Sequence, residues 1–178
     1  MKTEYEIRFL EIDEKSITKK LKSLGAIEIG NWLQIRKTFD LVIPKQNSWV
    51  RLRTNGLITT LAVKEINSTK IDGTKEFEVT VDSFEETDEI LKKIGLKSRN
   101  YQENKRHQFK YKNTEIDIDT WPLIPTYVEI EGENEQIIKE ICSDLGLNYN
   151  QATTMDVTDI HKNIYNIDLL SIKELKFK

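Results

Sequence analysis

The chain has 178 residues, and its 27 Lys and Arg against 30 Asp and Glu leave a formal net charge of −3. This length suits one domain with its own core, and the lack of a basic excess argues against a nucleic-acid polymer as partner. The single cysteine, Cys142, excludes an intrachain disulfide, and at helical spacing among isoleucines it suits a buried thiol. No apolar run approaches membrane-spanning length and no secretory leader is evident, so we expect a cytoplasmic protein without a membrane partner.

The first predicted element is a strand over residues 4–9. Successive side chains of a strand point to opposite faces, so Glu4, Glu6 and Arg8 share one face while the other face is apolar. Taken alone, this pattern is typical of a half-exposed edge strand with a solvated face.

Helices and further strands follow in chain order. Apolar residues at helical spacing predict helices from about Glu14 to Gly25, from the capping box at Ser83 to Gly95, from Ile137 to Gly146, and a shorter one from Asp156. Alternating or β-branched runs predict strands over 33–43, 49–54, 57–66, 75–81, 99–112, 115–121 and 127–132. Asn55-Gly56 predicts a two-residue hairpin, and Pro122 and Pro125 should bend the chain. We assign 1–166 to one domain and 167–178 to a C-terminal tail, whose run Lys173–Lys178 is expected to be solvated.

Two halves of the chain look alike. Glu4-Tyr5-Glu6-Ile7 is echoed 72 positions later by Glu76-Phe77-Glu78-Val79, and the glycines that end the following helices are 70 positions apart. Each half would then supply one helix and about four strands. The pattern predicts an α+β fold, an eight-stranded antiparallel closed β-barrel with helices packed outside and pseudo-two-fold halves. Chance similarity between two amphipathic strands is the alternative.

Pairs of like charge recur at i, i+2 on the predicted strands. They are Glu4/Glu6, Arg51/Arg53, Glu76/Glu78, Asp117/Asp119 and Glu129/Glu131, and Lys64 lies on a strand between them. Like charges side by side are unfavourable unless opposite charge lies between them, so a solvated sheet face does not explain them well. In a closed sheet they would line the interior.

These charges suit a phosphate chain with a metal ion. Carboxylates without histidine or thiolate are hard oxygen ligands for Mg²⁺ or Mn²⁺. Guanidinium forks and a lysine are matching donors for phosphate oxygens. The interior would therefore bind a polyanionic phosphate together with a divalent cation.

The order of these motifs resembles the CYTH domain of the triphosphate tunnel metalloenzymes, a family that includes class IV adenylate cyclases, thiamine triphosphatases and inorganic triphosphatases. The resemblance implies a tunnel of eight strands that binds a small-molecule triphosphate and Mg²⁺ or Mn²⁺, in a monomer or homodimer. It implies metal ligation by Glu4, Glu6, Asp119, Glu129 and Glu131, and triphosphate binding by Arg8, Arg51, Arg53, Lys64, Lys105 and Arg106. Glu4, Glu6 and Arg8 would be the catalytic group, and Glu76, Glu78 and Asp117 additional tunnel carboxylates.

Several positions depart from the family pattern. Arg8 stands where the family usually has lysine, Asn104 stands where it tends to have a lysine, and no His-Phe precedes Glu4 as it does in class IV cyclases. The absence of His-Phe favours a metal-dependent triphosphatase acting on inorganic triphosphate, thiamine triphosphate or a nucleoside triphosphate. A class IV-like adenylate cyclase is the first alternative. A non-catalytic polyphosphate or nucleotide binding module, which Arg8 and Asn104 favour, is the second.

Aromatic and histidine side chains have simpler interpretations. Trp32, Trp49 and Trp121 are expected in the core or at the rim, where one could stack on a base. His107 is expected at the surface, on the outward side of its strand. The segment from Trp121 to Pro125 has no functional interpretation from sequence.

Overall fold

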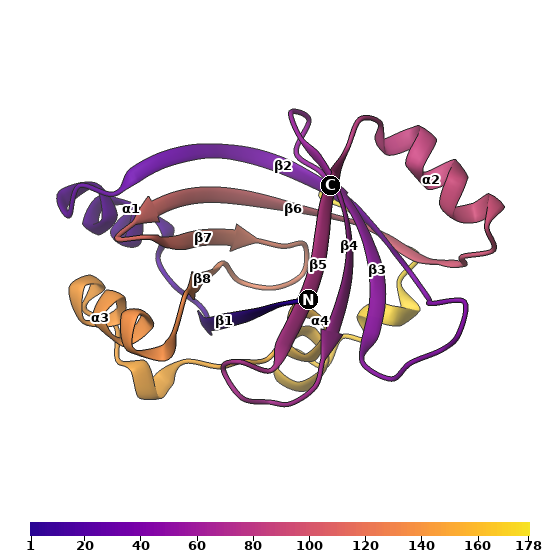
Figure 1. Ribbon diagram of the computed structural model, residues 1–178. Coiled ribbons are helices and arrows are strands. Elements are labelled where there is room, and N and C mark those ends of the chain that lie inside the picture. Colours follow the sequence, from indigo (N-terminus) through magenta and orange to yellow (C-terminus); the bar gives the residue numbers. More distant parts are fainter.

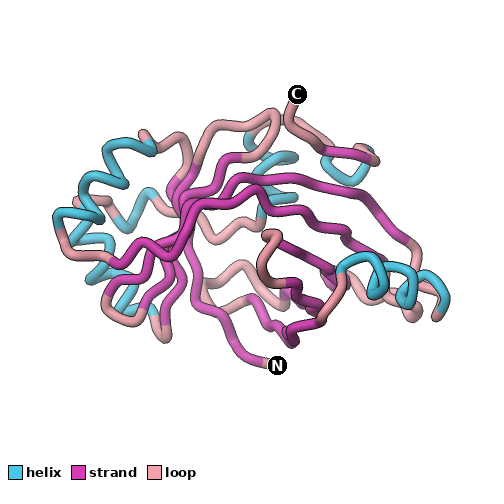
Figure 2. Tube along the Cα trace, turned by 90° about the horizontal axis from the view of Figure 1, so that it is seen from above, coloured by secondary structure: helices cyan, strands magenta, loops and turns pink.

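Eight antiparallel strands form a closed barrel in the computed structural model, which describes residues 1–178 (Figure 1, Figure 2). The strands lie in the order β2-β3-β4-β5-β1-β8-β7-β6, and pairing of β2 with β6 closes the ring. The predicted fold class is thereby confirmed. The strands are β1 Lys2–Phe9, β2 Ile27–Phe39, β3 Ser48–Thr54, β4 Thr59–Ile66, β5 Thr74–Val81, β6 Ser98–Tyr111, β7 Thr114–Thr120 and β8 Tyr127–Gly132.

The two halves predicted from the sequence repeat in the structure. A strand, a helix and three strands run from β1 through α1 (Glu14–Ser23) to β4, and again from β5 through α2 (Phe84–Lys93) to β8. Both helices begin at a side-chain cap: Asp13 accepts the amide of Ser16, and Ser83 accepts the amide of Glu86. Each cap satisfies a backbone donor that the first helical turn leaves free.

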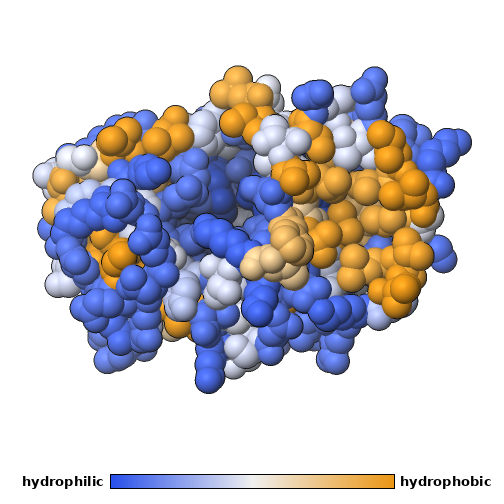
Figure 3. All heavy atoms as spheres, in the orientation of Figure 1, coloured by the Kyte–Doolittle hydropathy of each residue, from blue (hydrophilic) through white to orange (hydrophobic).

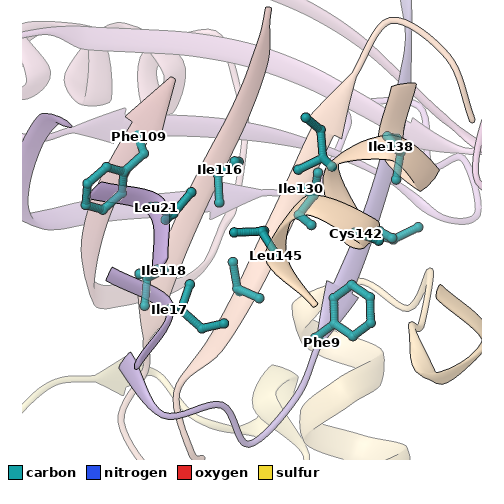
Figure 4. Close-up of a cluster of buried hydrophobic side chains, with 13 residues drawn as sticks. Phe9, Ile17, Leu21, Phe109, Ile116, Ile118, Ile130, Ile138, Cys142 and Leu145 are labelled. Carbon is teal, nitrogen blue, oxygen red and sulfur yellow. The ribbon is translucent and has the colours of Figure 1, made fainter. Parts of the chain in front are cut away.

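The main hydrophobic core lies outside the barrel, where α1 and α3 (Glu135–Leu145) cover β1 and β6 to β8 (Figure 4). Ile7 of β1 is 2% exposed in this layer, and Cys142 of α3 is buried there as predicted. Burial raises the pKa of the Cys142 thiol to about 11. Because this layer occupies the apolar side of these four strands, their alternate charged residues must point into the barrel.

The outer face of β5 is not covered in this way. Helix α2 packs through Leu91 on Phe39 and Leu52, whereas Phe77 and Val79 of β5 are 62% and 59% exposed. In Figure 3 hydrophobic residues gather over the region of β3, β4 and β5. Phe77, the apolar residue between Glu76 and Glu78, therefore faces outward without a helix over it.

Two predicted boundaries differ from the structure. Strand β2 begins at Ile27, six residues earlier than expected, and ends at Phe39 instead of residue 43. Its first residues are exposed, but they are part of the strand because they pair with the far end of β6, with Ile27 opposite Lys110. The β3–β4 connection has four residues rather than two, since Thr54 pairs with Thr59. The Asn55 side chain accepts the amides of Leu57 and Ile58, which stabilises this wider turn.

The last residues are part of the fold, so the predicted solvated tail is a wrong interpretation. After a short 3₁₀ turn (Tyr149–Gln151), α4 (Val157–Asp159) runs into a π-helical turn (Ile160–Ile164), and a 3₁₀ turn (Leu169–Ser171) leads to β9 (Glu174–Leu175), which pairs in parallel with β6. Leu169 and Leu175 are buried against Trp121. Leu175 stands among charged residues in the sequence, so the sequence pattern did not predict its burial. None of the helices is long and apolar enough to cross a membrane.

Candidate active site

The barrel encloses a cavity of about 1130 Å³ whose lining is mostly polar: 9 of its 43 residues are hydrophobic. Figure 3 shows hydrophilic residues around a hollow on this face of the molecule. This volume is slightly above the usual range of ligand sites, so it has room for a polyanion with its counterions. The cavity lining includes every predicted site residue except Lys105: Glu4, Glu6, Arg8, Arg51, Arg53, Lys64, Glu76, Glu78, Arg106, Asp117, Asp119, Glu129 and Glu131.

Arg8 joins the carboxylates of two neighbouring strands. Its Nη2 lies 2.8 Å from Glu6 Oε2 and 2.5 Å from Glu129 Oε2, since Arg8 and Glu129 are cross-strand partners of β1 and β8. Burial alone would raise the pKa of Glu129, but Arg8 and Arg106 lower it to about 2. Despite burial, Glu129 and Glu6 hold the pKa of Arg8 above its usual value. Both partners are therefore charged at neutral pH.

Arg106 makes the corresponding cluster on β6 and β7. Its Nε and Nη2 bind the two carboxylate oxygens of Asp119 at 2.8 and 2.5 Å, and Nη1 contacts Asp117. Asp119 is fully buried. Burial, reinforced by Asp119 and Glu129, raises the pKa of Asp117 to about 7 even beside Arg106. This cluster thus contains a carboxyl that titrates near neutral pH.

A third cluster spans β3, β4 and β5. Arg51 Nη2 lies 2.7 Å from Glu76 and 2.9 Å from Glu78, while Arg53 lies 3.3 Å from Glu78. Burial and the neighbouring Arg51 and Arg106 lower the pKa of Arg53 to about 10. The two arginines face two carboxylates, so an anion that binds here would replace Glu76 and Glu78 as the partners of the arginines.

Lys64 bridges the β1 and β5 carboxylates, with Nζ 3.0 Å from Glu4 and 3.5 Å from Glu76. Burial and a hydrogen bond with Glu76 raise the pKa of Glu4 to about 8. Burial opposes ionisation of Glu76 too, but Arg51, the Glu4 hydrogen bond and Lys64 lower its pKa to about 2. Between these values the pair shares one proton.

The donor set of the cavity fits a hard divalent cation, since its ionisable ligands are carboxylates. Asp117 Oδ1 is buried and accepts no hydrogen bond, which leaves one oxygen open for a positive partner. No three acidic, histidine or cysteine side chains are already gathered in a ligand cluster. A cation would therefore be held by carboxylates such as Glu6 and Glu129 after they exchange their arginine partners.

The remaining predicted residues lie farther from these clusters. Glu131 pairs with Lys2 at 3.2 Å, and burial raises the pKa of its carboxyl. Lys105 is exposed on the outer face of β6, with its ammonium 4.9 Å from the Phe177 ring. The prediction that Lys105 binds the triphosphate is therefore wrong, because the strand alternation that brings Arg106 inward turns Lys105 outward.

His107 points outward as predicted but is buried instead of at the surface. Its Nε2 lies 2.7 Å from Glu28 and its ring packs on Phe109 beneath α1. All three tryptophans line the cavity, with Trp121 in the core as well.

Sequence reasoning missed several buried cavity residues, among them Arg36 of β2 and Tyr127 of β8. Arg36 has no like-charged residue two positions before or after it, so the pattern of charge pairs does not include it. The available signal was the alternation of polar side chains along β2, at Gln34, Arg36 and Thr38.

Comparison with known proteins identifies the architecture. No family model and no curated protein matches the sequence. Among solved structures, the PH1012 protein from Pyrococcus horikoshii OT3 is similar with a TM-score of 0.74 and 22% identity over 86% of this chain and 96% of that chain. A putative adenylate cyclase from Vibrio parahaemolyticus has a TM-score of 0.74 at 13% identity, covering 89% and 97%.

A third similar structure comes from a plant. It is a putative adenylyl cyclase, HpAC1 from Hippeastrum, described as revealing a dominant triphosphatase activity, with a TM-score of 0.60 and 14% identity over 92% of this chain and 96% of that chain. Each of the three neighbours is matched over nearly its whole length. Together with the closed ring of eight strands, these matches show that the chain has the CYTH-type tunnel fold.

Proposed function

We propose that this protein binds a small-molecule triphosphate in its cavity and hydrolyses it with Mg²⁺ or Mn²⁺. The observation that carries the proposal is the interleaving of buried arginines and carboxylates from opposite sides of the ring. Arg8, Arg51 and Arg106 each contact at least two carboxylates. Such a set can exchange its internal ion pairs for phosphate oxygens on one side and a metal ion on the other.

Arginines and the lysine position the phosphate chain. Arg51 and Arg53 point into the same region from β3, and Lys64 reaches it from β4. Their N–H groups would bind non-bridging oxygens and neutralise the charge that a phosphoryl-transfer transition state redistributes. Positioning of this kind does not need a covalent intermediate.

Carboxylates supply the other half of the chemistry. A divalent cation, when bound, neutralises phosphate charge and lowers the pKa of a coordinated water. Glu6 and Glu129 would hold it, together with Glu4, Asp119 and Glu131. Glu4, whose pKa of about 8 leaves it mostly protonated at neutral pH, could orient a water molecule and would accept its proton only above that pKa.

Cyclisation of ATP is the second candidate function. Its support is that neighbours such as the Vibrio parahaemolyticus protein are named putative adenylate cyclases. In that reaction a ribose 3′-hydroxyl attacks the α-phosphorus and pyrophosphate leaves. The same charged groups would serve, with the triphosphate bound in the opposite direction.

The test is a substrate panel of inorganic triphosphate, thiamine triphosphate, ATP and GTP with Mg²⁺ or Mn²⁺, in which phosphate, pyrophosphate and cyclic nucleotide are measured. Release of phosphate that EDTA abolishes is the expected result. Cyclic AMP with pyrophosphate would select the cyclase. Binding of triphosphate without turnover of any substrate would select a non-catalytic binding module instead.

A further inference from the structure

Arg36 is a buried cation of the cavity that none of the ion-pair clusters includes. It is 7% exposed, lies in the middle of β2 and lines the cavity. Arg8, Arg51, Arg53, Arg99 and Arg106 all have a carboxylate within 4.0 Å, and Arg36 alone among the arginines has none.

Neutral groups hold the Arg36 side chain in place. Its Nη2 donates to Gln34 Oε1 at 3.1 Å and to Asn104 Oδ1 at 2.5 Å. Asn104 is fully buried and donates in turn to Asp119 at 3.2 Å, which orients its amide oxygen toward the arginine. The Nε of Arg36 is buried without any hydrogen-bond partner. Two amides thus fix the guanidinium while at least one donor is left over.

Trp121 fixes the plane of the same group. The guanidinium carbon lies 4.5 Å from the centre of the indole ring, and the indole Nε1 donates to the Tyr127 hydroxyl at 3.0 Å. Stacking of this kind suits arginine and restrains its rotation without neutralising its charge. It also gives a role to Trp121, the first residue of a segment that the sequence left unexplained.

The surroundings of Arg36 are electrostatically unfavourable for a cation. Burial, with Arg53, Arg51 and Arg106, holds its pKa well below the usual value, and Asp119 offsets this only in part. An anion that reaches this position relieves the repulsion and fills the free donor. It does so without first breaking an ion pair, unlike binding at Arg8, Arg51 or Arg106.

We propose that Arg36, oriented by Asn104 and Trp121, forms a metal-independent subsite for one phosphoryl group of the substrate. This inference rests on the proposed triphosphate-binding function and deepens it. The phosphoryl group enters at Arg36 first, and the ion pairs of the other clusters exchange when the divalent cation binds. Nη1, which makes no hydrogen bond within the protein and is not enclosed as Nε is, is the donor for its oxygens.

The test is calorimetric binding of inorganic triphosphate to the full chain in EDTA. Wild type should bind, and Arg36→Gln should weaken binding by about tenfold or more, the loss of a charge-assisted hydrogen bond. Lys105→Gln is the matched control, because it removes one positive charge from the outer side of the neighbouring strand. It should bind within about twofold of wild type, since exposed charges are screened by salt.

Two measurements keep the outcomes distinct. Thermal unfolding should show Arg36→Gln at least as stable as wild type, because a buried unpaired charge is removed. If that variant does not fold, Arg36→Lys, which keeps the charge but loses the planar guanidinium that Asn104 and Trp121 orient, should weaken binding in the same direction by a smaller factor. Equal binding by wild type and Arg36→Gln in EDTA, or no binding by wild type, overturns the subsite even if the substrate panel shows turnover. Loss of binding in Arg36→Gln without turnover of any substrate upholds the subsite and overturns the hydrolase.

Discussion

Strands β1 and β5 carry the same pattern and lie side by side, but they end in different surroundings. Glu4-Tyr5-Glu6-Ile7 and Glu76-Phe77-Glu78-Val79 pair antiparallel at their first residues, with Lys2 opposite Glu76. On β1 both glutamates are buried in the cavity, whereas on β5 the Glu78 side chain is 33% exposed. On the outer side, Ile7 is 2% exposed and Val79 is 59% exposed.

What covers the strand explains the difference. Helix α3 packs over β1 and β8 through residues such as Ile138. No helix packs over the outer face of β5 in the same way. Alternation along a strand therefore predicts which side chains share a face, but the burial of that face depends on elements contributed from elsewhere in the chain. The following variants test this contrast.

The largest contrast should be in stability. Ile7→Ala should lower the free energy of unfolding by about 2 to 5 kcal/mol because it opens a cavity in the packed layer. Val79→Ala, at the equivalent position of β5, should change it by less than about 0.5 kcal/mol since the side chain is in solvent. Chemical denaturation measures both, and similar losses would mean that a further structure covers β5.

The second contrast concerns metal activation. Glu6→Gln should raise the Mg²⁺ concentration needed for half-maximal activity by about 10- to 100-fold or more, given what even outer-shell changes cost. Glu78→Gln should shift it by less than about fivefold, since a partly exposed ion pair contributes roughly 1 kcal/mol or less. Comparable shifts would place the metal between the two strands instead of beside β1.

Arg53, which contacts the β5 carboxylate Glu78, should act on the substrate more than on the metal. Arg53→Ala should weaken inorganic triphosphate binding by about tenfold or more through loss of a charge-assisted hydrogen bond. Its effect on the Mg²⁺ requirement should be smaller. Titrations of each ligand at a saturating concentration of the other separate the two effects, and equal effects would contradict this division of roles.

The smallest contrast lies in pH dependence. Because the pKa of Glu4 is raised from 4.5 to about 8, the folded chain holds a proton that the unfolded chain releases, so this group's contribution to stability is lost as pH rises from 4.5 to about 8. Metal binding that displaces this proton should strengthen by up to about tenfold per pH unit below pH 8. Glu76→Gln removes the neighbouring carboxylate and should flatten this slope, measured by Mg²⁺ titration at several pH values.

Much of the fold could be predicted because local patterns and the closed ring agree. Charge pairs of one sign, such as Asp117/Asp119, are stable only with opposite charge nearby, and this requirement already pointed to a filled interior. Their partners could not be assigned, since Arg106 reaches Asp119 across β6 and β7 through pairing register that the sequence does not state. The roles in binding and catalysis stay predictions.

Other features were hidden because their signal depends on distant residues. Arg36 is significant only because Asn104 and Trp121 surround it from other strands and loops. Leu175 lies in a charged terminus, and nothing near it in the sequence predicts its burial. It is buried because β9 pairs with β6, a strand more than sixty residues earlier in the chain.

The position of β1 in the ring has a consequence for folding. This strand is the first part of the chain to be synthesised, yet its neighbours are β5 and β8, so Glu6 faces Glu131 only after about three quarters of the chain exists. Contacts so distant in sequence form slowly. The buried charges of Glu4, Glu6 and Arg8 thus stay hydrated until the barrel closes, and a truncated or half-folded chain cannot contain the site.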